Sequence, residues 1–329
     1  VDNREDGRAV YELKLNSADS FDYTVAFKVI DGELEWAVLQ SGNGFVGIMQ
    51  QYEGSIAAIG MEFGPLVKVG GQGDVMHELF KAFAKAGKDV SVVMPYFASM
   101  VEKLERYEAE DVEGVEIKIQ FNRRKDEILR VKKTAIDGIT VYMLVAQSED
   151  MFVNPYSGKE TEFYESILLS RGALELFKQL GIRPEIIHTN DHHTALASLY
   201  MRSGFGDYFA RTGSIFTIHN IGYQGEYPVE WLPEIGLSNI EPFIVKSGRL
   251  NFMATVPEVI LRLGGKGNYI NTVSETYAKE IRGTYFEIDR LLQDVSNRFG
   301  GILNGIDFEV WNPATDTALA ANYDISKDA

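Results

Sequence analysis

The chain has 329 residues, of which 45% are hydrophobic and 24% charged. These fractions are typical of a folded globular protein and exclude wholesale disorder or a fibrous repeat. Lys and Arg total 32 and Asp and Glu total 48, so the formal charge of -16 should repel nucleic acids and anionic lipid surfaces. Because there is no cysteine, disulfides, thiolate nucleophiles and Cys-ligated metal sites are excluded.

The sequence shows no targeting or anchoring signal. No apolar run approaches the length of a membrane span, and the first residues lack the apolar core of a signal peptide. We therefore expect neither a membrane partner nor a nucleic-acid partner. The chain begins with Val and stops without an evident closing element, so we also expect it to be a fragment of a longer protein.

Residues 1–53 are predicted to form a β-rich extension. Alternate residues of 21–29 and 34–38 are apolar, and Asp31 and Gly32 between them favour a tight turn, so the pattern predicts a β-hairpin. Its aromatic residues Phe21, Tyr23 and Trp36 have two interpretations. They fill a small β core, which we favour, or they stack on sugar rings as the end of a carbohydrate-binding module.

From residue 54 onward, short apolar runs alternate with helical stretches. The first helix is expected at 74–86, ended by Gly87. Such alternation predicts an α/β fold with a doubly wound parallel sheet, in which ligands bind beyond the carboxyl ends of the strands. The predicted strands are 56–59, 90–94, 139–146, 186–188, 214–218 and 269–273.

Residues 62–74, which lie between the first predicted strand and the first helix and include its first residue, contain four glycines and Lys68. Such a loop either brings backbone N–H groups to a phosphate-bearing ligand at the start of the helix or merely turns the chain tightly. Two known phosphate motifs are absent. No Gly-Lys pair is followed by Ser or Thr, and Met76 stands where a dinucleotide-binding loop needs its third glycine, which disfavours a nicotinamide dehydrogenase.

Four of the five histidines lie at two predicted strand ends, in residues 188–194 and at His219. Three histidines and Asp191 in the first segment could ligate a divalent metal. The predicted strand-loop-helix path points these side chains in different directions, which favours hydrogen bonding to sugar hydroxyls instead. The fifth histidine, His77, lies within a predicted helix and is expected to be structural or exposed.

Five stretches match one known family in order and spacing, over residues 56–316. This chain resembles the bacterial glycogen synthases and plant starch synthases, which are retaining glucosyltransferases of glycosyltransferase family 5. The stretches are KVGGQGDV at 68–75, HTNDHHT at 188–194, FTIHNIGYQG at 216–225, NTVSETYA at 271–278, and GILNGID at 301–307 followed by WNP at 311–313.

The resemblance implies a GT-B fold, in which two Rossmann-like domains face a common cleft. Residues 54–329 would be the N-terminal, acceptor-side domain, without the C-terminal domain that binds the nucleotide sugar. The implied reaction transfers glucose from ADP-glucose to the nonreducing end of an α-1,4-glucan. ADP-glucose is then a substrate, and neither a cofactor nor a metal is expected.

The resemblance also implies roles for residues that match the family's motifs. His219 and Asp191 are the expected catalytic residues, because the first matches a histidine facing the donor glucose and the second lines the same cleft. Tyr156, His193 and Asn220 are the expected sugar-binding residues of that cleft.

Four residues of the glycine-rich segment are expected to bind the donor. Lys68 would lie near the phosphates or ribose, and Gly70 and Gly71 would allow the backbone to approach them closely. Asp74 is either a substrate-binding residue or mainly a helix cap.

The sequence departs from the family pattern at four positions. Gln72 replaces a Leu, Asn190 and His192 replace a His and a Trp, and Ala254 stands where a Lys is common. These changes are either neutral or alter acceptor preference. Without the C-terminal domain, which supplies the cations that neutralise the leaving diphosphate, the chain is expected to be inactive.

Two other functions remain open, a noncatalytic α-glucan-binding module and a metal-dependent hydrolase built on the histidines. The sequence does not distinguish glycogen from starch as the product, ADP-glucose from UDP-glucose as the donor, or bacterial cytoplasm from plastid stroma as the compartment.

Overall fold

The computed structural model describes residues 54–329 except 265–266, 284–285, 306–310 and 325–329, and within residues 1–53 it describes only the backbone of the strands. The chain divides into two units, Val1–Gly54 and Ser55–Ala329. In the first unit the sheet has the order β1-β2-β3-β4-β5, and all its pairs are antiparallel. These strands are β1 (Asp2–Asn3), β2 (Arg8–Asn16), β3 (Asp22–Ile30), β4 (Glu33–Ser41) and β5 (Gly44–Gln50).

The predicted hairpin of the first unit is formed by β3 and β4. The interpretations offered for Phe21, Tyr23 and Trp36 concern side chains that lie outside the described residues. The GILNGID motif also falls partly outside them, because residues 306–310 are not described.

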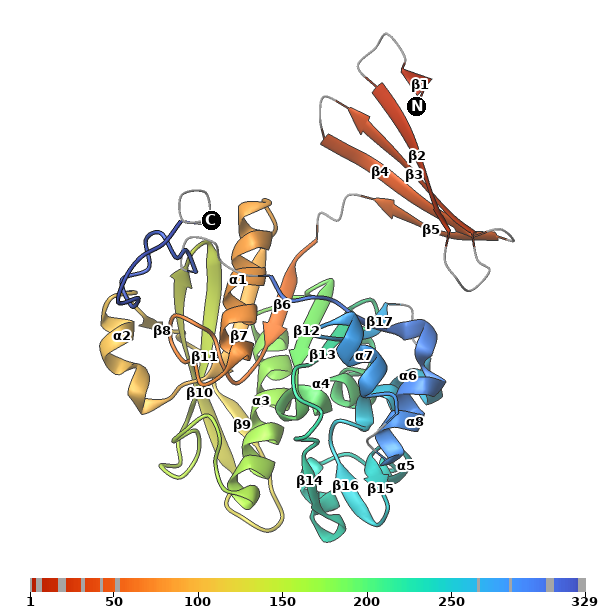
Figure 1. Cartoon of the computed structure of the whole chain (residues 1–329). Helices are drawn as coiled ribbons and strands as arrows, with labels where there is room; N and C mark the ends of the chain where they lie inside the picture. The colour runs from red at the N-terminus through yellow and green to blue at the C-terminus, as the bar shows by residue number, and fades with distance from the viewer. Residues whose placement is uncertain are drawn as a thin grey trace. The chain divides into compact units, whose positions relative to one another are not determined.

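The second unit is built on a sheet with the strand order β18-β17-β13-β12-β6-β7-β11-β10-β8, and β9 pairs with β10 (Figure 1). From β18 to β11 every neighbouring pair is parallel. The strands are β6 (Ile56–Ile59), β7 (Val90–Pro95), β8 (Glu110–Asp111), β9 (Ile117–Ile119), β10 (Glu127–Ile136), β11 (Ile139–Ala146), β12 (Ile186–Asn190), β13 (Gly213–Ile218), β17 (Asn268–Thr272) and β18 (Phe299–Gly301).

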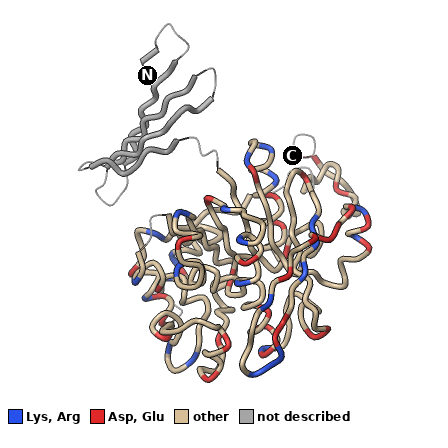
Figure 2. The backbone as a smooth tube through the Cα atoms, turned by 180° about the vertical axis from the view of Figure 1, so that it is seen from behind, with Lys and Arg blue, Asp and Glu red and all other residues tan. Residues whose placement is uncertain are grey.

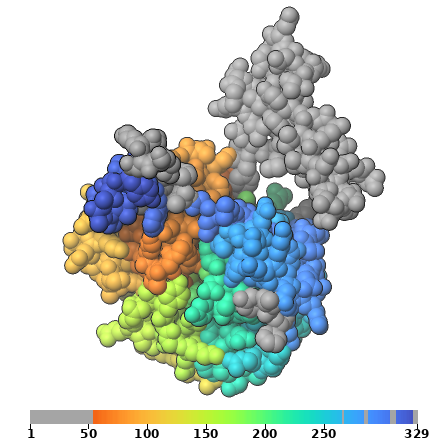
Figure 3. Space-filling view, in the orientation of Figure 1, coloured from red at the N-terminus to blue at the C-terminus, as the bar shows by residue number. Residues whose placement is uncertain are grey.

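The parallel part of this sheet has the doubly wound arrangement. From β6 the chain first adds β7 and β11 on one side, then returns to add β12, β13 and β17 on the other. This is the strand order of Rossmann folds, so the predicted fold class is confirmed. Figure 3 shows the result on the surface, where residues 55–150, in orange to yellow-green, lie on one side and residues 200–300, in teal to blue, on the other.

One antiparallel hairpin was not predicted. β11 is parallel to β7, but on its other side it pairs with β10 in antiparallel register. Asp137 and Gly138 join the two strands with φ angles of 51° and 80°. An Asp-Gly pair with two positive φ values is the signature of a two-residue hairpin turn.

Helices cover both faces of the sheet (Figure 1). The first helix begins at Gly71, three residues earlier than predicted, with Gly70 as its N-cap. Asp74 therefore lies inside the first turn, and the interpretation of Asp74 as a cap is wrong. The α-helices are α1 (Gly71–Lys85), α2 (Val101–Glu105), α3 (Lys159–Gln179), α4 (His192–Ser203), α5 (Glu241–Ile244), α6 (Thr255–Leu263), α7 (Glu275–Glu280) and α8 (Phe286–Asp294).

A small antiparallel sheet, β14-β16-β15, follows the loop after β13. Its strands are β14 (Glu226–Pro228), β15 (Val245–Lys246) and β16 (Arg249–Asn251), and short 3-10 helices are η1 (Ala98–Met100), η2 (Gly206–Phe209), η3 (Val229–Ile235) and η4 (Ser296–Arg298). Lys, Arg, Asp and Glu are interspersed over the described residues (Figure 2). Among these residues, no helix has both the length and the apolar character needed to cross a bilayer.

The longest helix, α3, contains a buried carboxylate, Glu165. Its Oε1 accepts a hydrogen bond of 2.7 Å from the backbone N–H of Phe152, whereas its Oε2 has no partner among the described residues. Burial raises the pKa of Glu165 from 4.5 to about 7, against the hydrogen bonds that it accepts. This carboxyl group thus anchors the loop that precedes α3.

Replacing Glu165 with glutamine should flatten the dependence of stability on pH. Between pH 4.5 and about 7 the folded chain retains a proton that the unfolded chain releases, so the free energy of unfolding should fall as pH rises. Across this range the contribution of Glu165 to the free energy of unfolding falls by about 3 kcal/mol, and most of this decrease is complete at pH 7. Urea denaturation at a series of pH values measures it.

The matched control for this experiment is Glu160→Gln, which changes an exposed carboxylate on the same helix. Its free energy of unfolding should fall with pH as steeply as that of the wild type. Equal slopes for wild type and Glu165→Gln would contradict the proposed proton retention at Glu165.

Candidate functional site

The candidate site lies at the topological switch point of the doubly wound sheet, between β6 and β12. β6 and β12 are neighbours, but the chain leaves them toward opposite sides of the sheet. In folds of this type the carboxyl-terminal loops of two such strands separate, and ligands bind in the crevice between these loops. The glycine-rich segment follows β6, Asp191 follows β12 and His219 follows β13.

Asp191 connects two of these loops through its side chain. Its Oδ1 accepts hydrogen bonds from the backbone N–H groups of His219 (2.8 Å) and Asn220 (3.2 Å), and its Oδ2 accepts from Nε2 of Gln72 (3.2 Å). Asp191 is the N-cap residue of α4, yet its side chain makes no capping bond. Its φ of 53° and ψ of −177° lie in a region that glycine alone adopts easily. The backbone is therefore strained where the carboxylate reaches across the crevice.

The imidazole of His219 is held by its neighbour in the sheet, Asn190. Nδ2 of Asn190 donates to the carbonyl oxygen of Ile59, which leaves Oδ1 to accept from Nε2 of His219 at 2.9 Å. Burial lowers the pKa of His219, against the opposing charges of Asp191 and Glu62. His219 is therefore a neutral imidazole at neutral pH, with its Nε2 proton engaged by Asn190.

The glycine-rich loop is held by a residue that the sequence analysis did not identify, Glu62. Its carboxylate is fully buried, and Oε2 accepts from the backbone N–H groups of Val69 (2.7 Å) and Gly70 (2.9 Å). Oε1 accepts from the hydroxyl of Tyr156. Two of the N–H groups expected to face an anion are thus occupied by an internal carboxylate.

The other donor-site candidates lie on the open side of this loop. Lys68 and Asp74 form an ion pair of 2.8 Å in which both side chains are about half exposed. A Cβ atom added at Gly70 or Gly71 would meet no atom within 4 Å. The space beside these two glycines is therefore free for a ligand, and the exposed Lys68 ammonium can exchange Asp74 for one at little cost.

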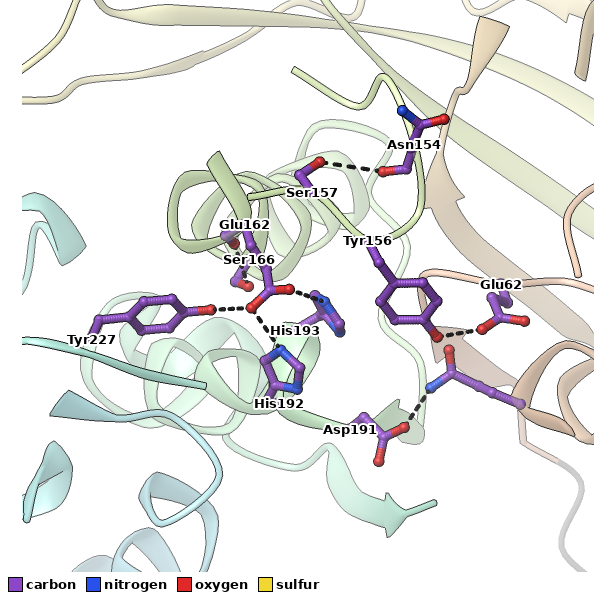
Figure 4. Close-up of polar contacts among 11 residues, drawn as sticks. Glu62, Asn154, Tyr156, Ser157, Glu162, Ser166, Asp191, His192, His193 and Tyr227 are labelled. Atoms are coloured by element: carbon purple, nitrogen blue, oxygen red, sulfur yellow. Dashed lines mark hydrogen bonds and ion pairs between the residues drawn. The ribbon is translucent and has the colours of Figure 1, made fainter. Parts of the chain in front are cut away.

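Tyr156 lies between His193 and Glu62, and its hydroxyl points toward the Glu62 carboxylate (Figure 4). The ring centroids of Tyr156 and His193 are 5.6 Å apart. Burial raises the pKa of Tyr156, and the hydrogen bond and charge of Glu62 raise it further, so its hydroxyl remains protonated and donates. The buried His193 follows Asp191 by two residues, in the first turn of α4.

Two histidines considered with the site lie apart from this network. Nε2 of His188 bonds to Oγ1 of Thr217 at 2.6 Å within the sheet, and burial lowers the pKa of His188 to about 3. His77, on α1, forms ion pairs of 2.8 Å with Glu78 and Asp137. Both therefore have structural roles.

Three departures from the family pattern fall inside the network. Gln72 donates to Asp191, Asn190 accepts from His219, and His192 faces a carboxylate of α3, Glu162. These replacements therefore alter the immediate surroundings of the two expected catalytic residues. Ala254, by contrast, is buried at the start of α6.

The sequence analysis considered three histidines and Asp191 of residues 188–194 as metal ligands, but the structure brings a different set together. Glu162, His192 and His193 form one set in the described residues whose donor atoms lie within 4.8 Å of one another. The two rings, however, are 3.8 Å apart and only 34° from parallel. An imidazole binds a metal in the plane of its ring at about 2.0–2.1 Å. Rings stacked this closely direct their Nε2 atoms side by side, so the geometry argues against one shared ion.

Chemically, the crevice combines carboxylates with an open loop that carries a cation. Glu62 and Asp191 are carboxylates beside the space between the two loops, where they can stabilise positive charge that develops on a ligand. Lys68 and the amino end of α1 can bind a phosphate. This chemistry suits transfer of a sugar from a phosphate-bearing donor.

Comparisons with known proteins identify the family. A family model described as the starch synthase catalytic domain matches residues 55–295. Glycogen synthase from Thermotoga maritima is 32% identical over 287 residues, which cover 83% of this chain and 56% of that protein. Glycogen synthase from Geotalea daltonii is 33% identical over 284 residues, covering 82% and 55%.

A solved structure agrees with these matches. The catalytic domain of starch synthase IV from Arabidopsis thaliana, bound to ADP and acarbose, superposes with a TM-score of 0.71 at 29% identity, over 83% of this chain and 56% of that one. The chain thus spans about half the length of the curated relatives it matches. It belongs to the family of starch synthase catalytic domains, in which these glycogen synthases are its relatives.

Proposed function

We propose that this chain is the acceptor-side domain of a retaining glucosyltransferase, which transfers glucose from ADP-glucose to the nonreducing end of an α-1,4-glucan. ADP-glucose is a substrate, and no cofactor is required. The observation that carries the proposal is the Asp191 carboxylate. It accepts hydrogen bonds from the backbone N–H groups of His219 and Asn220 at the topological switch point of the sheet. The ADP and acarbose bound to the Arabidopsis relative support a nucleotide and a sugar in this crevice.

In this proposal, each side of the crevice has a distinct task. Tyr156, His193 and Asn220 bind sugar hydroxyls, and His219 faces the donor glucose. Lys68, Gly70, Gly71 and Asp74 belong to the phosphate side, where Asp74 holds Lys68 until a ligand replaces it. Asp191 stabilises the positive charge that develops as the diphosphate departs.

A second domain would complete the enzyme. A leaving diphosphate carries more negative charge than Lys68 alone can neutralise. We therefore propose that a C-terminal nucleotide-sugar domain supplies further cations and that residues 54–329 alone transfer little glucose. The β unit at residues 1–53 is proposed to be an accessory extension, either a small β domain or the end of a carbohydrate-binding module.

A titration of this chain with maltoheptaose and, separately, with ADP-glucose tests the proposal, followed by an assay of glucose transfer to glycogen. Glucan binding with weak ADP-glucose binding and no transfer is the expected result. Measurable transfer by this chain alone would overturn the requirement for a second domain. Glucan binding without turnover after the second domain is added would favour a noncatalytic glucan-binding module.

Lys68→Ala, in a protein that contains both domains, should reduce kcat/KM for ADP-glucose by about tenfold or more, or about 1.4 kcal/mol. The reason is loss of a positive charge beside the donor phosphates. Lys133→Ala is the matched control, because Lys133 is also about half exposed and paired to a carboxylate, Glu110, at 3.0 Å. Equal kinetics for the two variants would remove Lys68 from the donor site.

A further inference from the structure

A carboxylate on α3, that of Glu162, faces the first two residues of α4 (Figure 4). Its Oε1 lies 3.2 Å from Nε2 of His192, and its Oε2 lies 3.7 Å from Nε2 of His193. The hydroxyl of Tyr227 donates to Oε1 at 2.9 Å. Both imidazoles are buried, and their rings are stacked. One carboxylate therefore contacts two adjacent histidines and a tyrosine.

This arrangement determines where the protons of the imidazoles lie. An ionised carboxylate only accepts hydrogen bonds, so a bare Nε2 facing it would bring two lone pairs together. Burial alone would raise the pKa of Glu162, but the bonds and charges of His192 and His193 outweigh it and hold that pKa well below its usual range. Glu162 is therefore ionised, and each Nε2 that faces it carries a proton.

The two imidazole rings, of His192 and His193, differ in their remaining nitrogen, Nδ1. Burial and the neighbouring His192 lower the pKa of His193 to about 4, so His193 is neutral at neutral pH and a proton on Nε2 leaves Nδ1 bare. Two ring nitrogens are fully buried without a hydrogen-bond partner in the described part of the chain, Nδ1 of His192 and Nε2 of His193. Nε2 of His193 therefore meets Glu162 as a charge contact of 3.7 Å and not as a hydrogen bond, and Nδ1 of His193 is not one of these fully buried atoms. His193 therefore has one bare nitrogen, Nδ1, in a side chain that is 2% exposed.

The surroundings of His193 indicate what this nitrogen binds. Its ring lies 5.6 Å from that of Tyr156, and Asp191 precedes it by two residues, so it borders the proposed sugar side of the crevice. A bare nitrogen accepts hydrogen bonds, and a sugar hydroxyl donates them. The phosphate oxygens of a nucleotide are acceptors and do not suit it.

We propose that Glu162 is a positioning residue that fixes the proton of His193 on Nε2, so that Nδ1 accepts a hydrogen bond from a sugar hydroxyl. The fixed proton position follows from the contacts of Glu162 with the two rings and from its ionised state, whereas the identity of the sugar rests on the proposed function. Gln is the informative replacement because its side chain offers one oxygen and one NH2 group. It can accept from one Nε2–H, but it must donate to, or clash with, the other.

The test is a long-range 1H–15N correlation spectrum of the whole chain with labelled histidine, which distinguishes protonated from bare ring nitrogens. Five histidines make the assignment tractable. We expect His193 of the wild type to be protonated on Nε2. A proton on Nδ1 would overturn the proposal without any variant being made, so poor folding of a variant leaves it testable.

The variant Glu162→Gln should then move the proton of His192 or His193 from Nε2 to Nδ1. Glu165→Gln, which removes another buried carboxylate of the same helix, should leave both tautomers unchanged. Unchanged tautomers in Glu162→Gln, or the same change in both variants, would overturn the role of Glu162.

Addition of maltoheptaose to the wild type separates this proposal from the proposed function. Binding is expected to shift the Nδ1 resonance of His193, and binding without that shift would overturn its role as acceptor. If Nε2 carries the proton and no maltoheptaose binds, the proton position stands and the proposed sugar fails. In a protein with both domains, Glu162→Gln should raise KM for the glucan about fivefold and leave KM for ADP-glucose unchanged.

Discussion

Asp191→Asn is expected to lower kcat of the two-domain protein by about 100- to 1000-fold while changing the free energy of unfolding by less than about 1 kcal/mol. The replacement removes the negative charge and keeps the shape. Its amide oxygen can still accept from the N–H groups of His219 and Asn220. The amide NH2 would meet Gln72, whose own Oε1 is buried without a partner in the described part of the chain. Rotation of the Gln72 amide by 180° pairs its Oε1 with the new amide NH2 and leaves Nε2 of Gln72, in place of Oε1, as the buried atom without a partner, so the number of unpaired groups stays the same.

Asp137→Asn is the matched control for this experiment. Asp137 also has a positive φ, of 51°, and forms an ion pair, but it lies in the β10–β11 turn away from the crevice. It should keep full activity. Steady-state kinetics and urea denaturation of both variants make the comparison. A loss of less than about threefold in Asp191→Asn would show that the charge of Asp191 does not stabilise the transition state.

His219→Ala is expected to lower kcat about 100-fold or more with only a small loss of thermal stability, since the ring lies at the end of its strand beside the crevice. Within the described residues, the hydrogen bond of its side chain is the one to Oδ1 of Asn190. Loss of the ring removes a group beside the donor glucose and leaves space that water can enter. Kinetics and thermal melting measure the two effects separately.

His188→Ala provides the contrasting case. His188 is buried within the sheet and bonds to Thr217, which in turn donates to Asn271, so its loss should lower the melting temperature substantially. Its activity, measured well below the melting temperature, should fall only as far as its folded fraction falls. If His219→Ala behaved in the same way, with activity tracking stability, His219 would have a structural role.

Local patterns in the sequence account for most of the fold. Apolar runs predicted every parallel strand of the described sheet except β18, and the family resemblance implied that Asp191 and His219 line one cleft. The β10–β11 hairpin was missed although Asp137 and Gly138 carried its turn signal. The start of α1 was placed three residues late because Asp74 resembled a cap, whereas Gly70 occupies that position.

The supporting carboxylates of the site were not predictable from such patterns. Glu62 lies seven and eight residues before the N–H groups that it binds, and 94 residues before Tyr156. Glu162 lies 30 residues before His192, within a helix whose composition is otherwise ordinary. Glu62 lies in a loop, where no helix or strand period applies, and Glu162 and His192 lie on different helices, so only the packing of the chain reveals these contacts.

The buried carboxylate of Glu62 also has an energetic consequence for the two substrates. It holds the glycine-rich loop through Val69 and Gly70, and it holds Tyr156 on the sugar side. A sugar that takes the Tyr156 hydroxyl away from Glu62 leaves the carboxylate with fewer donors and strengthens its hold on the loop. Under the proposed function, the affinity for ADP-glucose then depends on whether the glucan is bound. By thermodynamic reciprocity, ADP-glucose would change the affinity for the glucan by the same factor.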